Sequence, residues 1–284
     1  MIISVASGKG GTGKTTIAVN LAVSLDRQVQ LLDCDVEAPN AHLFLNPSIH
    51  ERQTVTTPIP VIDTDKCSFC KKCMEICRFN AIAVLKKKVL VFDNLCHSCG
   101  GCFEVCPEGA VVEKRKVLGE IEKGLSGRVR VSQGRLNIGE VMVPPVIKQL
   151  RDKEGLRDII IIDAPPGTSC PVIAAVHKTD FALLVTEPTP FGLHDLKLAV
   201  QTVKLLDIPC GIVINRAGLG NGAVHDYAQE EGIPVLMEIP FDKRIAQHYS
   251  NGAVIVDAIP GLKDRFSDLF EKIRCILEER ETVK

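Results

Sequence analysis

Two stretches of this 284-residue sequence hold residue types at spacings that suit binding chemistry. One is the nonapeptide at residues 8–16, GKGGTGKTT, whose glycines, lysines and threonines suit the binding of phosphate groups. The other lies between residues 67 and 106 and holds eight of the twelve cysteines, whose regular spacing suits a metal centre. The rest of the chain must supply the strands and helices that position these two groups.

The nonapeptide follows an apolar run, residues 2–6, and precedes residues 17–22, which have the composition of a helix. A strand, a glycine-rich turn and a helix are the context that a phosphate-binding loop requires. Glycines let backbone N–H groups converge on phosphate oxygens, and the helix N-terminus adds the positive end of its dipole. We therefore predict that Lys14 reaches the β- and γ-phosphates of a nucleotide and that Thr15 binds Mg²⁺. The residues predicted to contact nucleotide in this loop are Gly8, Lys9, Gly10, Gly11, Thr12, Gly13, Lys14, Thr15 and Thr16.

The cysteines form two copies of the spacing C-x2-C-x2-C-x3-C, and each cysteine of the second copy stands 29 positions after its counterpart. This is the pattern of bacterial two-cluster ferredoxins, in which the fourth cysteine of each copy binds the other cluster. Zinc is the competing metal, but four tetrahedral ligands give no reason for the third and fourth cysteines to recur. We predict one 4Fe–4S cluster on Cys67, Cys70, Cys73 and Cys106 and a second on Cys96, Cys99, Cys102 and Cys77.

Composition excludes several classes of protein. The net charge of −1 argues against a protein-wide surface for nucleic acid. No apolar stretch reaches the ~18–20 residues that span a bilayer, and the amino terminus has no signal segment. A cytoplasmic location is therefore expected, where the cysteines are thiols or metal ligands rather than disulfides.

Strand and helix patterns alternate through the sequence, which predicts an α/β fold with a mostly parallel sheet and helices on both faces. Residues 29–32 form a predicted strand that leads to Asp33 and Asp35, and residues 159–162 form another that leads to Asp163. Ligands bind outside the carboxyl ends of parallel strands, so these carboxylates are expected to face the phosphates. A helix from Pro144 to about Glu154 is predicted between them.

Lys9 makes the phosphate loop more specific. GKGGTGKTT resembles the deviant phosphate loop of the MinD/ParA/nitrogenase-iron-protein group of ATPases, and the resemblance covers residues 1–60 and 117–284. It implies an ATP- and Mg²⁺-dependent enzyme that forms a nucleotide-sandwich dimer, with Lys9 acting across the interface on the partner's nucleotide.

The same resemblance implies roles for residues at the strand ends. Asp35 would orient and activate the attacking water, Asp33 would support the Mg²⁺ shell, and Asp163 would bind Mg²⁺ through water. The segment after Asp163 looks like the family's switch, in which Gly167 senses the γ-phosphate. Asn215 resembles the residue that reads adenine, and the loop that begins at Pro240 resembles the one that closes over the base.

Residues 61–116 are expected to form a small α+β ferredoxin-like domain, inserted after the second strand of the ATPase domain. The Thr- and Pro-rich residues 53–61 look like a connector. Residues 81–92 are expected to form a β-hairpin whose turn carries Lys86–Lys88, as a solvated turn or as a docking patch for an acidic redox partner.

Cys170 lies seven residues after Asp163. In the nitrogenase iron protein a cysteine at this spacing binds a cluster shared by two subunits, but residues 132–143 lack the second cysteine that such a cluster needs. The expectation is therefore a buried thiol at a helix start. Apolar residues of the last helix, from Phe266 to Leu277, are expected to pack in the core rather than to bind a membrane.

These expectations combine into a dimeric switch ATPase, homomeric or paired with a sibling ATPase, that controls how an iron–sulfur domain meets a redox partner. Hydrolysis is expected to be slow or stimulated by a partner, without nucleic acid and without stable membrane association. The sequence also leaves open an iron–sulfur carrier, although Cys210 and Cys275 are isolated and form no C-x-x-C near the carboxyl end. Two further classes stay open: a spatial organiser, and an electron-transfer module that does not hydrolyse its nucleotide.

Overall fold

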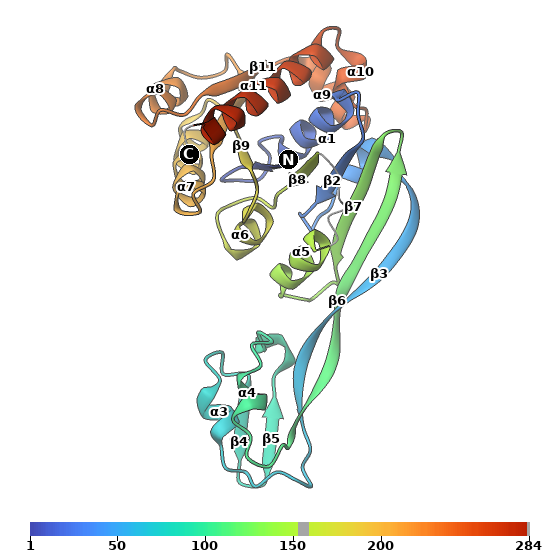
Figure 1. Ribbon diagram of the computed structural model, residues 1–284, viewed down its shortest axis with the longest axis vertical. Helices are drawn as coiled ribbons and strands as arrows, with labels where there is room; N and C mark the ends of the chain where they lie inside the picture. The colour runs from blue at the N-terminus through green and yellow to red at the C-terminus, as the bar shows by residue number, and fades with distance from the viewer. Residues whose placement is uncertain (153–158, 283–284) are drawn as a thin grey trace.

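Runs of β-branched and other apolar residues form a nine-stranded sheet whose central strands are buried on both faces (Figure 1). The structure, a computed structural model, describes residues 1–152 and 159–282. In spatial order the strands are β11 (Val235–Pro240), β10 (Cys210–Ala217), β9 (Phe181–Thr186), β1 (Ile2–Ala6), β8 (Ile160–Asp163), β2 (Val29–Asp33), β7 (Val129–Leu136), β6 (Val111–Ser126) and β3 (Ser48–Ile62). The first seven in this order are mutually parallel, and the last two are antiparallel to their neighbours. The predicted α/β fold with a mostly parallel sheet is confirmed.

Helices cover both faces of the sheet, as predicted. One face packs against α1 (Lys14–Ser24), α2 (Ala41–Leu45), α10 (Ile255–Ala258) and α11 (Leu262–Thr282). The other face packs against α5 (Val143–Arg151), α6 (Cys170–Val176), α7 (Pro190–Leu205) and α8 (Ala223–Glu230). The last helix, α11, buries Phe266, Leu269, Phe270 and Ile273 completely or nearly so, so its apolar positions are core residues, as expected.

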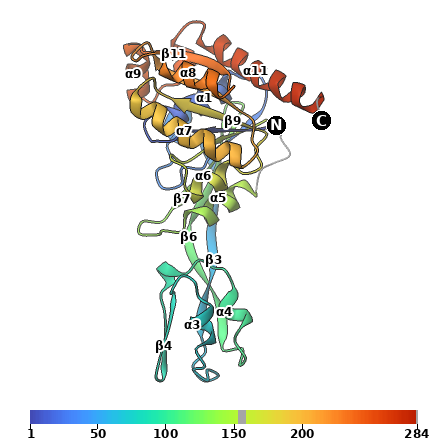
Figure 2. The same cartoon turned by 90° about the vertical axis from the view of Figure 1, so that its left-hand side faces the viewer.

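Strands β3 and β6 are much longer than the others, and together they form a two-stranded ribbon that leaves the sheet (Figures 1 and 2). Their pairing is continuous from Ser48↔Leu125 to Ile62↔Val111, with two local shifts of register. The connector expected at residues 53–61 is therefore wrong, because these residues belong to β3. The cysteine-containing segment follows the third strand rather than the second, and the expected boundaries at 60/61 and 116/117 fall inside β3 and β6.

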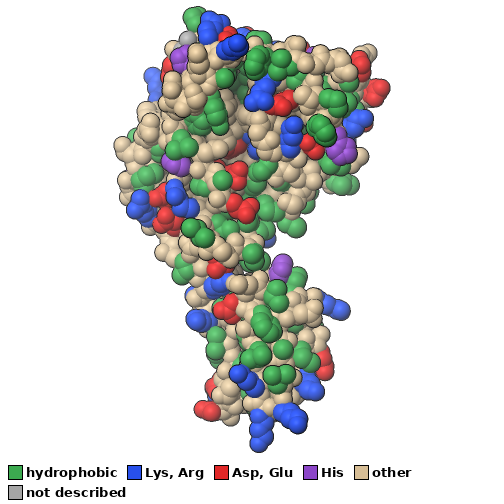
Figure 3. All heavy atoms as spheres, turned by 180° about the vertical axis from the view of Figure 1, so that it is seen from behind, with side chains coloured by type: hydrophobic (Ala, Val, Ile, Leu, Met, Phe, Trp, Pro, Cys, Tyr) green, Lys and Arg blue, Asp and Glu red, His purple; other side chains and the backbone are tan. Residues whose placement is uncertain are grey.

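Residues 63–110, here called the cysteine unit, fold at the far end of the ribbon (Figure 1). They contain α3 (Lys72–Ile76), η1 (Asp93–Leu95), α4 (Gly101–Glu104) and a hairpin of β4 (Ile82–Leu85) and β5 (Lys88–Val91). The hairpin matches the one predicted for residues 81–92, with its turn at Lys86 and Lys87. Basic side chains gather at the end of the unit farthest from the sheet (Figure 3).

The cysteine unit has internal twofold symmetry that reaches into the ribbon. Ile82 pairs with Val91 in the hairpin, and Ile62 pairs with Val111 at the end of the ribbon. Val111 stands 29 positions after Ile82, and Val91 stands 29 positions after Ile62. The end of the ribbon is therefore the structural counterpart of the β4–β5 hairpin, so the unit and the large sheet share two strands.

Two predictions outside the sheet have mixed outcomes. The helix expected from Pro144 to about Glu154 is α5, which ends at Arg151; Glu154 lies outside the described residues. Cys170 does begin α6, but its side chain is exposed, so the expectation of a buried thiol is wrong. Cys170 lies on the solvent side of this short helix, which buries Val172, Ala175 and Val176.

Candidate nucleotide site and metal centres

The phosphate loop lies at the carboxyl edge of the sheet and borders a cavity of about 420 Å³. Gly10, Gly11, Gly13, Lys14, Thr15 and Thr16 line the cavity, whereas Gly8, Lys9 and Thr12 lie outside its lining. Gly13 precedes α1 with φ 93°, and a Cβ at this position would lie 2.5 Å from Nδ2 of Asn215. Both the left-handed backbone and the close neighbour therefore require glycine.

Thr15, which lines this cavity, contacts Asp163, and the Lys14 ammonium acts electrostatically on the same carboxylate. The Thr15 hydroxyl donates a 2.5 Å hydrogen bond to Oδ2 of Asp163, and the other carboxylate oxygen, Oδ1, is buried without a hydrogen-bond partner among the described residues. Burial raises the pKa of Asp163 well above its ordinary value, and the negative charge of Asp33 adds to the rise. A buried, unpartnered carboxylate oxygen beside a threonine hydroxyl is an oxygen-donor set suited to Mg²⁺.

Asp35 is one of the acidic residues that line the nucleotide cavity. It is partly buried, and desolvation raises the pKa of its carboxyl group, whereas the Lys14 ammonium opposes the rise. The side chain comes from the turn after β2, on the same sheet edge as the phosphate loop. Its place suits a group that contacts a water molecule beside the phosphates.

Asp33 lies next to this site, but its carboxylate accepts hydrogen bonds from the backbone of the turn that follows β2. Its carboxylate is fully buried and accepts the N–H groups of Asp35, Asn40 and Ala41 at 3.1, 2.9 and 2.9 Å. Burial raises the pKa of Asp33 to about 6, although these three N–H groups lower it. The geometry gives Asp33 the task of closing the turn that carries Asp35, and its support of the Mg²⁺ shell stays a prediction.

The residues expected to contact the adenine base of the nucleotide are brought together. Asn215, Pro240, Phe241 and Asp242 all line the cavity, from the ends of β10 and β11. The side-chain amide of Asn215 donates to the carbonyl of Thr12 at 2.8 Å, and its oxygen accepts the N–H of Arg216. In this structure Asn215 therefore holds the phosphate loop.

The switch segment after Asp163 is tied to the start of the phosphate loop. The Gly167 N–H donates to the carbonyl of Ser7 at 3.0 Å, and Gly167 has φ 95°. The Ser7 hydroxyl in turn donates to the carbonyl of Lys9 at 2.5 Å. The backbone of Gly167 is therefore joined to the phosphate loop through Ser7.

Sequence patterns did not indicate Glu187 and Arg216, two residues beside the loop. Glu187 follows the last residue of β9, and its carboxylate pairs with Arg216 at 2.7 Å and with Lys9 at 3.7 Å. Arg216 also lines the nucleotide cavity and has a left-handed backbone, φ 55°. The rule that singled out Asp33 and Asp163, a charged residue at a strand's carboxyl end, also applies to Glu187 and would have found it.

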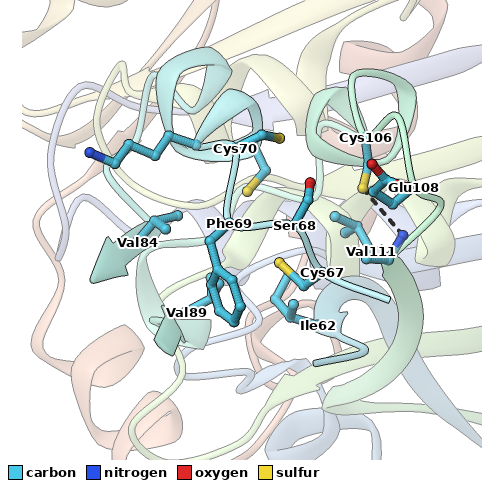
Figure 4. A pocket seen from close by; sticks show the side chains of 13 residues that line it. Ile62, Cys67, Ser68, Phe69, Cys70, Val84, Val89, Cys106, Glu108 and Val111 are labelled. Atoms are coloured by element: carbon cyan, nitrogen blue, oxygen red, sulfur yellow. Dashed lines mark hydrogen bonds between the residues drawn. The ribbon is translucent and has the colours of Figure 1, made fainter. Parts of the chain in front are cut away.

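The eight cysteines of the two repeats line two small cavities in the cysteine unit, and the groups cross between the repeats. Cys67, Cys70, Cys73 and Cys106 line one cavity (Figure 4), and Cys77, Cys96, Cys99 and Cys102 line the other. Within the described residues, no three His, Cys, Asp or Glu side chains stand close enough to hold a single metal ion. The cysteines of each group surround their cavity instead.

The chemistry of the loops around these cavities suits iron–sulfur clusters. Backbone N–H groups of Ala81, Ser98 and Ala110 point at the sulfur atoms of Cys77, Cys96 and Cys106, at 3.3, 3.5 and 3.2 Å; Figure 4 marks the last of these contacts. Such N–H groups stabilise negative charge on thiolates and tune cluster potentials.

Backbone strain also recurs with the repeat. Left-handed φ values occur at Phe69 and Ser98, at Lys71 and Gly100, and at Asn80 and Gly109, each pair 29 positions apart. For a residue other than glycine this conformation costs roughly 1–2 kcal/mol. The same left-handed conformation at equivalent positions of both loops, glycine at two of them in the second repeat, indicates loops shaped to wrap a group in each cavity.

The second cavity is also joined to the ribbon. The Phe79 and His97 rings stack with centroids 3.7 Å apart at its border. The Thr57 hydroxyl of β3 donates to that of Ser98 at 2.9 Å. Lys116 of β6 places its Nζ 3.0 Å from Oδ1 of Asn94 and 2.8 Å from Oε2 of Glu140. The loop between β7 and α5 is thereby linked to the cysteine unit through one side chain.

In the part of the chain that the structure describes, no helix has the length and apolar character needed to cross a membrane.

Comparison with known proteins agrees with this geometry. An uncharacterized protein of Methanocaldococcus jannaschii is 32% identical over 258 residues, which cover 89% of this chain and 90% of that protein. The iron-sulfur cluster carrier protein of Pyrococcus horikoshii is 29% identical, with 98% of this chain and 86% of that protein covered.

Among solved structures, the septum site-determining protein MinD from Pyrococcus horikoshii, complexed with Mg-ADP, has the same fold. Its TM-score is 0.61 at 23% identity, and the match covers 96% of this chain and 95% of that one. Residues 3–255 match the family model described as the CobQ/CobB/MinD/ParA nucleotide binding domain. The chain therefore belongs to the CobQ/CobB/MinD/ParA family of nucleotide-binding proteins.

Proposed function

We propose that this protein is a Mg²⁺-dependent ATPase whose nucleotide state controls a unit that carries two 4Fe–4S clusters and exchanges electrons with a partner protein. The main support for this proposal is that β3 and β6 run without interruption from the large sheet to the unit that holds the two cysteine cavities. Strand β2 is parallel to β7, and β6 is antiparallel to both β7 and β3, so β3 runs in the direction of β2. The ribbon thus leaves the sheet at its carboxyl edge, where the nucleotide cavity opens.

The residues of the ATP site have distinct tasks. The N–H groups of the phosphate loop and the Lys14 ammonium bind the phosphates. The hydroxyl of Thr15 and the carboxylate of Asp163 would hold Mg²⁺, which neutralises charge on the phosphates when bound. Asp35 orients the attacking water and accepts its proton. The chain works as a homodimer or with a sibling ATPase, in which Lys9 contacts the partner's nucleotide.

In the cysteine unit, the two groups of four thiolates described above would hold one cluster each. Clusters of this type supply one-electron transfer at potentials that hydrogen bonds to sulfur and solvent exposure adjust. The N–H groups aimed at Cys77, Cys96 and Cys106 are contacts of that kind. Lys86 and Lys87, exposed at the tip of the hairpin, add positive charge that suits an acidic redox partner.

Coupling between the sites follows from how the unit is attached. The turn closed by Asp33 carries Asp35, leads into α2, and continues into β3. On the return path from the cysteine unit, β6 pairs with β7, which lies beside β2. Strand β7 ends at the loop that contains Glu140. A change in the acidic turn on hydrolysis therefore reaches both strands of the ribbon.

Anaerobic purification tests the composition of this assembly. Two 4Fe–4S clusters give about eight iron and eight sulfide per chain, and native mass spectrometry reports the dimer and any co-purified partner. Coupling is then tested by measuring cluster potentials and partner affinity with ADP and with a nonhydrolysable ATP analogue. Identical values in both states would refute nucleotide control.

A second function, an iron–sulfur cluster carrier, is favoured by the relative of that name at 29% identity. In a carrier the clusters are cargo that leaves the protein. Incubation with an apo-ferredoxin, followed by separation and iron analysis, distinguishes the two functions. Transfer of clusters to the acceptor supports the carrier, and retention of both clusters in the presence of a chelator supports the electron-transfer unit.

Lys116→Met is expected to weaken coupling, because its ammonium joins the loop of Glu140 to Asn94 in the cysteine unit. A largely shielded ion pair of this kind contributes about 1 kcal/mol, so at most about 40 mV of a nucleotide-dependent shift in potential is lost. Redox titration monitored by electron paramagnetic resonance measures this shift. Lys123→Met, on the same strand but paired with Glu51 of β3, is the matched control and keeps the full shift. An equal loss in both variants would contradict the assigned role.

A further inference from the structure

We propose that lysines around one of the two cysteine cavities form the docking surface for an acidic electron-transfer protein, whereas the other cavity lies on the side of the large sheet. The partner-facing cavity, here called the first, is lined by Cys67, Cys70, Cys73 and Cys106. The second cavity is lined by Cys77, Cys96, Cys99 and Cys102. The inference rests on the proposed function and deepens it, because it states which cavity meets the partner and through which side chains.

Charge is divided unequally between the two halves of the cysteine unit. Residues 63–92 contain seven Lys and Arg and three Asp and Glu, whereas residues 93–110 contain three Asp and Glu and neither Lys nor Arg. The loop of the first cavity, residues 67–73, belongs to the positive half, and the loop of the second, residues 96–102, belongs to the negative half. An acidic protein is therefore attracted to the first loop, although the whole chain carries a net charge of −1.

Five exposed lysines near the first cavity, here called the basic face, supply most of this positive charge: Lys71, Lys72 and Lys86–Lys88. Lys71 lines the cavity, and Lys72 is the first residue of α3. Lys86–Lys88 stand between Val84 and Val89, which also line the cavity. Basic side chains gather at the end of the unit farthest from the sheet, where a partner can approach (Figure 3).

The lysines of the basic face are not neutralised within the chain. In the part of the chain that the structure describes, none of the five forms an ion pair, and one acidic residue, Glu108, lines the first cavity. By the 29-residue repeat, Lys86 and Lys87 correspond to Arg115 and Lys116 of β6, and each of these pairs with a glutamate at 2.8 Å. Equivalent positions thus carry paired charge on the ribbon and unpaired charge on the hairpin.

The second cavity is bordered by the ribbon. Pro58 and Pro60 of β3 line it, and both precede Ile62, which lines the first cavity at the end of the ribbon. The second cavity therefore lies nearer to the large sheet along β3. Both cavities have one exposed cysteine, Cys70 and Cys99, so solvent contact alone does not select between them, whereas charge and attachment do.

The exchange that this surface serves moves one electron and no atoms. A reduced acidic donor loses one electron and the group held by the first cavity gains it, so no bond forms or breaks and no proton is transferred. The task of the basic face is to hold the donor with its redox centre against the first cavity. Complementary charge at such a contact speeds encounter and fixes orientation.

Calorimetric titration with oxidised flavodoxin, a small acidic electron-transfer protein, tests the docking surface on the full chain with its clusters in place. Lys71→Gln with Lys72→Gln removes two positive charges from the basic face, and Lys86→Gln with Lys87→Gln removes two others. We expect each double variant to bind about tenfold more weakly at low ionic strength, because two exposed ion pairs with the partner are lost.

The matched control is Lys114→Gln with Arg115→Gln, which removes the same charge from exposed positions of β6. This variant should bind flavodoxin as the wild type does. An equal loss in the control would mean that the net charge of the chain, and not the basic face, attracts the partner, and the inference would be overturned.

Carbodiimide cross-linking gives a second readout that does not depend on substitutions, because it joins carboxylates of the partner to lysines at the contact. Peptide mapping should find Lys71, Lys72 or Lys86–Lys88 in the products. Cross-links confined to the lysines of β6, or to those around the nucleotide cavity, would contradict the assigned surface.

Removal of one cysteine group at a time tests which cavity receives the electron. Cys77→Ser leaves the first cavity intact and should keep the rapid phase of reduction by reduced flavodoxin in stopped flow, whereas Cys67→Ser should lose it. Dithionite, a small reductant, should reduce the remaining cluster in both. The opposite pattern would reverse the assignment and overturn the inference.

Failure of the inference is distinguishable from failure of the proposed function. A wild type that carries both clusters but binds neither flavodoxin nor an acidic ferredoxin overturns the docking surface alone. A purified chain without iron and sulfide refutes the proposed function instead, and calorimetry and cross-linking still report whether the basic face binds an acidic protein.

Discussion

Cys77→Ser is expected to remove the cluster of the other cysteine repeat and to lower iron from about eight to about four per chain. Cys77 belongs to the first repeat in sequence, but it lines the cavity of Cys96, Cys99 and Cys102. Loss of one thiolate ligand leaves three, and a serine hydroxyl is a poor substitute for a soft thiolate at iron. Iron and sulfide analysis with electron paramagnetic resonance after reduction measures the loss.

Second substitutions show which cysteines share a cluster. Cys77→Ser with Cys96→Ser alters one cavity twice, so iron stays at about four per chain. Cys77→Ser with Cys67→Ser alters both cavities, and we expect no cluster to remain. Ligation confined within each repeat would give the reverse pattern. Cys170→Ser is the control, because this exposed cysteine lines neither cavity, and its iron content should equal that of the wild type.

Asp35→Asn is expected to lower ATP turnover about 10²–10⁴-fold, the usual contribution of a positioned general base. Asn keeps the size of the side chain but cannot accept the proton of the attacking water. ATP affinity should hold or increase, because a negative charge beside the phosphates is removed. Phosphate release under saturating ATP, together with calorimetry, separates these two effects.

Glu37→Gln provides the matched control for this substitution. Glu37 lies in the same turn and acts electrostatically on Asp35, but its side chain is exposed and it does not line the cavity. We expect its turnover to stay near that of the wild type. Asp35→Asn with normal turnover would remove Asp35 from the catalytic role. Lost turnover with undiminished electron transfer would favour a module whose nucleotide is structural.

Local sequence was most informative where the chemistry is contained in one short segment. The phosphate loop needs only a strand, glycines and a helix in succession, and residues 2–24 supply all three. The cysteine spacing likewise predicted the two groups of four that line the two cavities, because three cysteines of each group lie in one loop and the repeat places the fourth.

Predictions failed where long-range pairing decided the outcome. Residues 53–61 hold Pro58 and Pro60, which argue against a central strand, but β3 is the edge strand of the sheet, where proline is tolerated. Their β-branched neighbours pair with β6, more than fifty positions later in the chain. The exposure of Cys170 also could not be predicted from nearby residues, because it depends on how α6 packs against the sheet.

The sequence by itself determined the family of the fold, the phosphate loop, the acidic strand ends and the spacing of the thiols, because each is a property of residues close together in the chain. Only the tertiary structure decided that β3 and β6 carry the cysteine unit beyond the nucleotide edge, since strand direction and register exist only in the assembled sheet. It also showed that Asp33 closes the turn directly after its own strand, through N–H groups within 8 positions of it. The pairing of Lys9 with Glu187, in contrast, depends on two distant segments that only the fold brings together.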